Sequence, residues 1–123
     1  MYTLAVKRAF FANHYLIGGD WGHENQPHTH EYQWQVIISG THLDKHGYVV
    51  DIVDIENAME TIIARFQNTT LNYHVEFADI NPSLERFAKI LWHELTEKIT
   101  LPEGTSLQVK LWENTSCWAG FGP

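Results

Sequence analysis

The sequence has one cysteine, Cys117, and this scarcity limits how the protein can be held together. A single cysteine cannot form an internal disulfide bond, and it cannot build a cysteine-rich zinc site. Any zinc bound by this chain must therefore be held mainly by histidine, of which there are eight.

Basic residues are also few. The 123 residues include 8 Lys and Arg against 15 Asp and Glu, which gives a formal net charge of −7. This balance argues against a nucleic-acid-binding protein, because such proteins need a broad basic surface. An anionic substrate would need a local basic patch, and Lys7 and Arg8 form the only adjacent basic pair.

Long apolar runs are absent, and so is a charged segment followed by an apolar one at the start of the chain. We therefore expect no membrane span and a soluble, cytoplasmic protein. The length predicts one domain, residues 1–123. The hydrophobic fraction of 44% is typical of an ordered, globular chain.

The histidines that are present form a pattern. The run 28–40 alternates like a strand, so His28 and His30 point to one face about 7 Å apart. His14 ends another strand-like run, 1–13. If these strands pair as neighbours, three imidazoles converge and leave a fourth position open, as in catalytic zinc sites. Eight histidines also produce such pairs by chance, so spacing alone leaves a metal site and a surface pair both open.

The rest of the chain predicts helices and a terminal hairpin. We expect a loop over 15–27, a helix from Asp54 to Phe66, an irregular segment over 67–80, a helix from Pro82 to Ile99, and strands over 107–113 and 118–121. Asp51 or Asp54 suits the first N-cap, and Asn81 before Pro82 suits the second. The predicted fold is α+β, in the order β-β-α-α-β-β, with a four-stranded antiparallel sheet and two helices on one face.

Five motifs carry a resemblance to a known family: 10–14 (FFANH), 28–30 (HTH), 47–51 (GYVVD), 81–85 (NPSLE) and 111–115 (LWENT). In this order and spacing, the chain resembles the 6-pyruvoyl-tetrahydropterin synthase and 6-carboxytetrahydropterin synthase family, pterin enzymes of the tunnelling fold. The resemblance runs from about residue 5 to the end. It implies a homo-oligomer, a trimer or hexamer, whose sites lie between subunits.

The resemblance also implies site residues. His14, His28 and His30 match the family's three zinc ligands, and Glu113 matches the carboxylate that anchors the pterin through its 2-amino and N3 groups. An ionised carboxylate suits that edge because it accepts two hydrogen bonds. The implied substrate is 7,8-dihydroneopterin triphosphate, with zinc assisting proton abstraction from its side chain.

Glu24 stands where most family members carry a cysteine base, four residues before the H-x-H pair. Family branches with a glutamate there are associated with cleavage of the side chain to leave 6-hydroxymethyl-dihydropterin. We therefore predict Glu24 as the base. Cys117 lies too far away in sequence to be a good substitute.

A second departure concerns the family's Asp-His pair, in which the histidine relays protons. Aligned on Leu71, this pair falls on Gln67 and Asn68, whose amides do not titrate near neutral pH. An alternative alignment with a one-residue insertion makes His74 the relay, without an adjacent aspartate. Both alignments stay open, and His74 is our candidate for the second catalytic residue.

Three functions follow from these patterns. The first is a zinc-dependent pterin lyase or synthase, most similar in length to the 6-carboxytetrahydropterin synthases of deazapurine (queuosine) biosynthesis, with the folate-type 6-hydroxymethyl product as competitor. The second is a non-catalytic tunnelling-fold protein that binds zinc and a pterin or purine. The third, a cupin, shares the H-x-H spacing but needs a carboxylate ligand where 36–38 are apolar.

Overall fold

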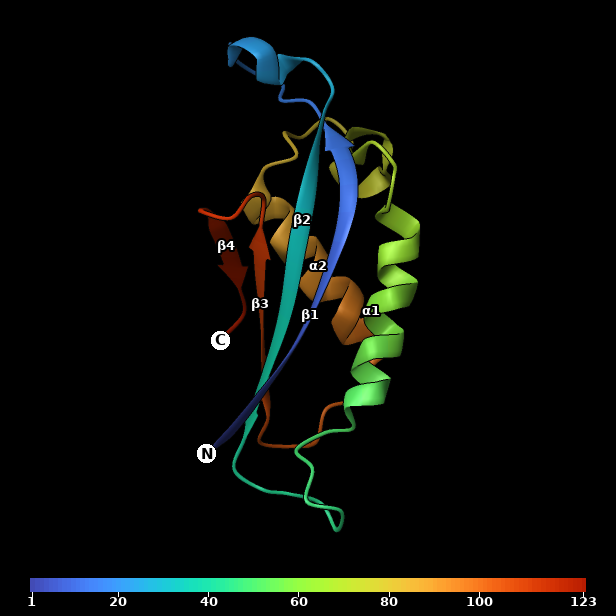
Figure 1. Cartoon of the computed structure of the whole chain (residues 1–123), viewed down its shortest axis with the longest axis vertical. Helices are drawn as coiled ribbons and strands as arrows, with labels where there is room; N and C mark the ends of the chain where they lie inside the picture. Colours follow the sequence, from blue (N-terminus) through green and yellow to red (C-terminus); the bar gives the residue numbers. More distant parts are fainter.

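A computed structural model describes all residues, 1–123. Four strands form one antiparallel sheet in the order β1-β2-β3-β4, and two helices cover one of its faces (Figure 1). The elements are β1 (Tyr2–His14), β2 (His28–Gly40), α1 (Ile52–Phe66), α2 (Leu84–Lys98), β3 (Ser106–Trp112) and β4 (Trp118–Phe121). The predicted β-β-α-α-β-β order is confirmed.

The two long strands pair along their whole length. Tyr2 lies opposite Gly40 at one end of the β1–β2 ladder, and His14 lies opposite His28 at the other. Alternate residues of β2 are buried from Tyr32 onward, as expected for a strand with one face against helices. The same face continues outward to His30 and His28, so the register brings all three histidines to one end of the sheet.

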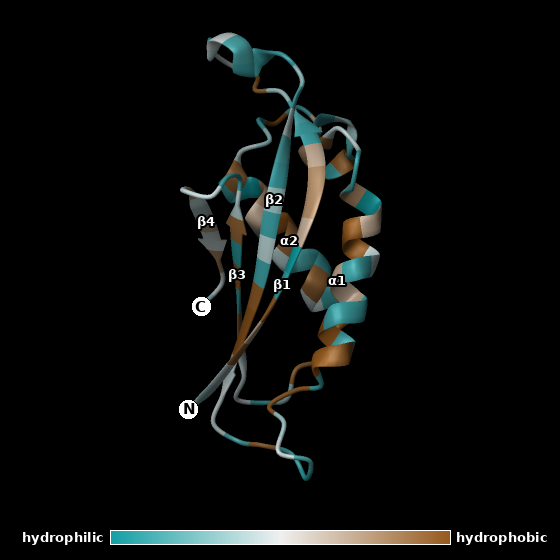
Figure 2. Ribbon diagram, in the orientation of Figure 1, coloured by the Kyte–Doolittle hydropathy of each residue, from teal (hydrophilic) through white to brown (hydrophobic).

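Each helix begins at a side-chain cap. Asp51 caps α1, because its Oδ1 accepts a hydrogen bond from Val53 N at 2.9 Å. Helix α1 therefore starts at Ile52, two residues before the expected start. Figure 2 shows hydrophobic and hydrophilic residues alternating along α1, as expected for a helix of which one side packs against a sheet.

The predicted start of the second helix is wrong. Ser83, and not Asn81, caps α2, and its Oγ accepts a hydrogen bond from Arg86 N at 3.2 Å. Asn81 Oδ1 instead accepts from Ile17 N at 2.9 Å. Pro82 directs its carbonyl oxygen at His14 Nδ1, 3.1 Å away. Residues 81–82 thus form hydrogen bonds with the end of β1 and with the loop after it, so the helix begins after Pro82.

Short 3-10 turns occur in the two segments that we expected to lack regular structure. They are η1 (Gly22–Asn25), in the loop between β1 and β2, and η2 (Leu71–Tyr73) and η3 (Val75–Phe77), between the helices. Turns of this length have no hydrophobic period long enough to be predicted from sequence.

The core beneath the histidine end of the sheet is aromatic. Phe87 of α2 is fully buried, and its ring lies 5.2 to 6.0 Å from those of Phe10, Tyr32, Phe66 and Phe77. Rings at these distances form favourable edge contacts and hold one another in place. The chain has no helix with the length and apolar character needed to cross a membrane.

Candidate metal centre

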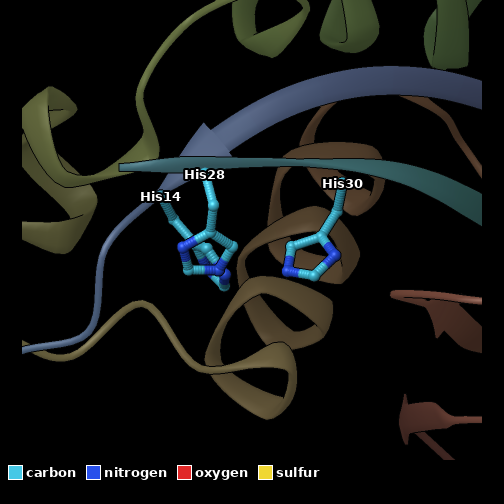
Figure 3. Close-up of side chains that lie close together, drawn as sticks. All are labelled: His14, His28 and His30. Carbon is cyan, nitrogen blue, oxygen red and sulfur yellow. The ribbon is translucent and has the colours of Figure 1, made fainter. Parts of the chain in front are cut away.

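Three histidines converge where β1 ends and β2 begins. The imidazole rings of His14, His28 and His30 lie 4.5 to 5.0 Å apart, centroid to centroid. One ligand nitrogen from each lies within 4.8 Å of the other two. Figure 3 shows the three side chains projecting from the same side of the sheet. This spacing is suitable for three ligands of one metal ion.

Backbone carbonyl groups orient two of the rings. His14 Nδ1 lies 3.1 Å from the carbonyl oxygen of Pro82, and His28 Nδ1 lies 2.8 Å from that of Gln26. Because a carbonyl only accepts, each Nδ1 carries the hydrogen and each Nε2 keeps its lone pair. Carbonyl partners of this kind fix the ring orientation of metal-bound histidines in proteins.

The Nε2 atoms of His28 and His30 are buried and have no hydrogen-bond partner. Buried polar atoms without a partner are rare because they lose their hydration. A metal ion would satisfy both atoms, so the three residues fit a metal. His14 is 2% exposed, and its pKa is lowered to about 4, mainly because burial disfavours the charged ring. The hydrogen bond to Pro82 raises this pKa somewhat, whereas the charges of His28 and His30 lower it. His14 is therefore neutral at pH 7, as a ligand must be.

Tyr32 lies next to two of the three rings, with its ring centroid 6.3 Å from that of His14 and 5.7 Å from that of His30. Its hydroxyl oxygen is 3.4 Å from His14 Nδ1, and its ring packs against that of Phe87. Burial raises the pKa of this hydroxyl far above its usual range, and the negative charge of Glu113 raises it further. The hydroxyl therefore stays protonated and connects the candidate metal ligands to the aromatic core.

Glu113 follows the last residue of β3, and its Oε1 lies 3.6 Å from His30 Nε2. A cavity of about 290 Å³ opens beside it. Its lining comes from the end of β1, the loop after β1, the start of α2 and the end of β3: His14, Leu16, Glu24, Asn81, Ser83, Leu84, Glu85 and Glu113. The structure thus brings Glu24 and Glu113 to the same cavity as His14.

The family model for 6-pyruvoyl tetrahydropterin synthase matches residues 3–123. The chain belongs to this family. A protein of Archaeoglobus fulgidus named "Putative 6-carboxy-5,6,7,8-tetrahydropterin synthase" is 28% identical over 119 residues, which cover 94% of this chain and 91% of that protein. The family resemblance noted in the sequence is confirmed.

Solved structures of the 6-pyruvoyl tetrahydropterin synthase family share the fold. The Caenorhabditis elegans enzyme matches with a TM-score of 0.86 at 21% identity, covering 99% of this chain and 95% of that one. A Plasmodium vivax enzyme, in which a glutamate described as a catalytic residue is replaced by alanine, matches with a TM-score of 0.81 at 16% identity, covering 99% and 97%. The predicted tunnelling fold is confirmed.

Glu24 lies on η1. Its side chain is exposed at the cavity, while its carbonyl oxygen accepts a hydrogen bond from Leu16 N at 2.8 Å and ties the loop together. Cys117 is exposed in the turn before β4 and does not line this cavity.

His74 does not line the cavity of its own chain. Its Nε2 lies 2.8 Å from Thr69 Oγ1, and its ring packs 4.8 Å from that of Phe66. Burial lowers the pKa of His74, and the positive charge of Arg65 lowers it further, against the opposing effect of Glu76. Gln67 and Asn68, at the end of α1, do not line the cavity either.

Sequence reasoning missed the partners that hold the site in shape. The carbonyl oxygens of Pro82 and Gln26 orient the rings, and Asn81, Ser83 and Glu85 line the cavity. The motif over 81–85 was the available signal, but we used it as a helix start and as part of the family resemblance, without assigning its residues to the site.

Proposed function

We propose that this member of the family is a zinc-dependent pterin lyase or synthase that acts on 7,8-dihydroneopterin triphosphate or a close relative. One observation carries most weight: two buried Nε2 atoms without partners, on His28 and His30, face a third histidine, and the carboxylate of Glu113 lies 3.6 Å from one of them. Three neutral imidazoles with an open fourth position suit catalytic zinc.

Each proposed role follows from the chemistry of the side chain. His14, His28 and His30 would hold zinc through Nε2. When bound, zinc would supply Lewis-acid polarisation of oxygens on the substrate side chain, which makes neighbouring protons easier to remove. Glu113 would accept hydrogen bonds from the pterin 2-amino and N3 groups, and so orient the ring beside the histidines.

Glu24 is the proposed general base. It reaches the cavity that His14 also lines, and a carboxylate exposed there can accept a proton from the substrate. The glutamate described as catalytic in the Plasmodium vivax enzyme supports a glutamate in this role. Two products compete: 6-carboxytetrahydropterin, as in queuosine biosynthesis, and 6-hydroxymethyl-dihydropterin, which is used for folate.

Assembly is part of the same proposal. His74 does not line the cavity of its own chain, so its proposed role in proton relay requires a site shared with a neighbouring subunit. We therefore propose a trimer or a hexamer with sites at the interfaces. Light scattering during size-exclusion chromatography tests this, and a monomeric mass would contradict it.

The test of function is product identification. Zinc-loaded protein is incubated with 7,8-dihydroneopterin triphosphate, and products are identified by mass spectrometry. We expect one of the two products, and at least a hundredfold less of it from Glu24→Gln, as is typical when a general base is removed. Glu103→Gln is the matched control, because Glu103 is exposed in the turn before β3, at the other end of the sheet. No product from the unmodified protein would refute catalysis.

One observation favours a second function, binding without turnover. In the alignment on Leu71, the positions of the family's Asp-His pair hold Gln67 and Asn68, which cannot act as acid or base near neutral pH. A protein of this kind would bind a pterin or purine tightly, lose that binding in Glu113→Ala, and form no product.

A further inference from the structure

His14 is the last residue of β1, and β1 is an edge strand of the sheet. The outer backbone groups of an edge strand have no partner within the sheet, and the ends of such strands fray most easily. Strand β2 holds His14 opposite His28, but only along the inner side of β1. The position of the His14 ring therefore depends on what holds the outer edge of β1 at this end.

The segment that follows α1, residues 68–72, covers this outer edge where β1 ends. Asn68 N donates a hydrogen bond to the carbonyl oxygen of Phe11 at 2.7 Å, and Asn13 N donates one to the carbonyl oxygen of Thr69 at 2.8 Å. In a strand, the backbone groups of alternate residues point to the same edge. The covering segment therefore pairs with every second residue of β1 as the strand approaches His14.

Tyr15 is the next residue in this series, and a side chain holds it instead of a backbone. Asn72 Oδ1 accepts a hydrogen bond from Tyr15 N at 3.0 Å, and Asn72 Nδ2 donates one to the carbonyl oxygen of Tyr15 at 2.8 Å. A side-chain amide has both an acceptor and donors, so it can pair with both backbone groups of one residue, as a neighbouring strand does. Asn72 thus extends the outer row of hydrogen bonds one residue beyond His14.

The core in turn holds Asn72 in place. Asn72 is half-buried in η2, and Leu71 beside it is fully buried. The two hydrogen bonds of Asn72 therefore join the residue that directly follows His14 to a fixed part of the fold. This contact differs from that of Pro82, whose carbonyl oxygen orients the His14 ring. Asn72 acts on the backbone that carries the ring.

We infer that Asn72 is a positioning residue of the metal centre, provided that the three histidines bind zinc as proposed above. It does so through Tyr15, by keeping His14 where its ligand nitrogen lies within 4.8 Å of those of His28 and His30. Loss of partners outside the ligand sphere typically weakens metal binding about 10- to 100-fold. The lower end of this range applies to Asn72, because it acts through the backbone and not on the ring itself.

The test measures metal binding and does not depend on turnover. Zinc dissociation constants come from competition with a chromogenic chelator, on protein made without a histidine tag. Asn72→Ala removes both hydrogen bonds to Tyr15 and should bind zinc about tenfold more weakly than the parent. Cobalt is then bound in place of zinc, because its visible spectrum depends on the number and arrangement of its ligands. That spectrum should change in Asn72→Ala. Asn57→Ala is the matched control, since Asn57 is exposed on α1, and it should match the parent in both measurements.

A role in folding alone would give a different pattern. Asn72→Ala would then lower the Tm of the metal-free protein, but the zinc dissociation constant and the cobalt spectrum would equal those of the parent, and this result would overturn the inference. Asn72→Gln decides the question if Asn72→Ala does not fold. It keeps the amide but adds one methylene, so it can bond to Tyr15 only from a displaced position, and its zinc binding should also weaken. Parent-like zinc binding in Asn72→Gln would then reject the positioning role. A parent protein that binds no zinc would instead refute the proposed function.

Discussion

The proposed metal site predicts that zinc stabilises the folded protein and that His28→Ala removes most of this effect. His28 supplies a buried Nε2 without a partner, and its Nδ1 bonds only to a nearby backbone carbonyl. Removing the side chain therefore deletes one ligand and one local hydrogen bond while leaving the apolar core intact. His46→Ala is the control, because His46 is an exposed histidine in the turn after β2.

The size of the effect follows from linkage. A ligand present at a hundred times its dissociation constant adds about 2.7 kcal/mol to the free energy of unfolding. The 123 residues imply an unfolding entropy of roughly 0.26 kcal/mol/K, at about 2.1 cal/mol/K per residue. Zinc should therefore raise Tm by about 10 °C. If loss of one ligand weakens zinc binding about a hundredfold, the same zinc concentration only equals the dissociation constant of the variant. The zinc-induced rise in Tm then falls to about 1.5 °C.

The assay is differential scanning calorimetry of protein made without a histidine tag, stripped of metal and then reloaded with zinc. Metal-free His28→Ala should melt within a few degrees of the metal-free parent, which separates loss of a ligand from loss of the fold. Equal zinc-induced shifts in the parent and in His28→Ala would refute the three-histidine site, as would no shift in the parent.

Three further predictions concern the scaffold. Phe87→Ala should lower the free energy of unfolding by about 3–5 kcal/mol in urea titrations, because it empties the centre of a ring cluster, and a loss under 1 kcal/mol would contradict that packing. Ser83→Ala should cost about 1 kcal/mol by the same measurement, whereas Ser83→Gly should cost only a few tenths, since glycine is itself an acceptable cap. The pKa of His74 is lowered by burial and by Arg65, so the unfolded chain binds a proton more readily. Stability should therefore fall as pH drops below about 6.5, and His74→Gln should weaken this dependence in melts across pH while the part that comes from His14 remains.

Periodicity predicted the fold because burial on one face leaves a repeating signal. The alternating residues of 28–40 and the apolar stripe of α1 both form buried faces in the structure. The start of α2 was mispredicted for the opposite reason. Local preference favours Asn81 as a cap, but its side chain gains a hydrogen bond to Ile17, distant in sequence, and tertiary contacts outweigh propensity.

The site was predictable in part. His14 could be placed near His28 because two strands joined by a loop usually pair, and their register then follows from burial. The backbone carbonyl groups that orient these rings could not be predicted from the sequence, because every residue has such a group. Glu113 was predicted through the family resemblance. Glu85 was missed because a glutamate in the first turn of a helix is ordinary on electrostatic grounds alone.

The metal ligands and the proposed reactive groups differ in how deeply the fold holds them. His14 is buried, contacts Tyr32 of the core, and bonds to Pro82, which leads directly into the cap of α2. Glu24, in contrast, lies on an exposed 3-10 turn. A substitution at Glu24 should therefore alter the proposed proton transfer at little cost to the fold, whereas one at His14 should disturb the core. If Glu24 is the base, as proposed, this difference explains how its identity can change while the three histidines stay in place.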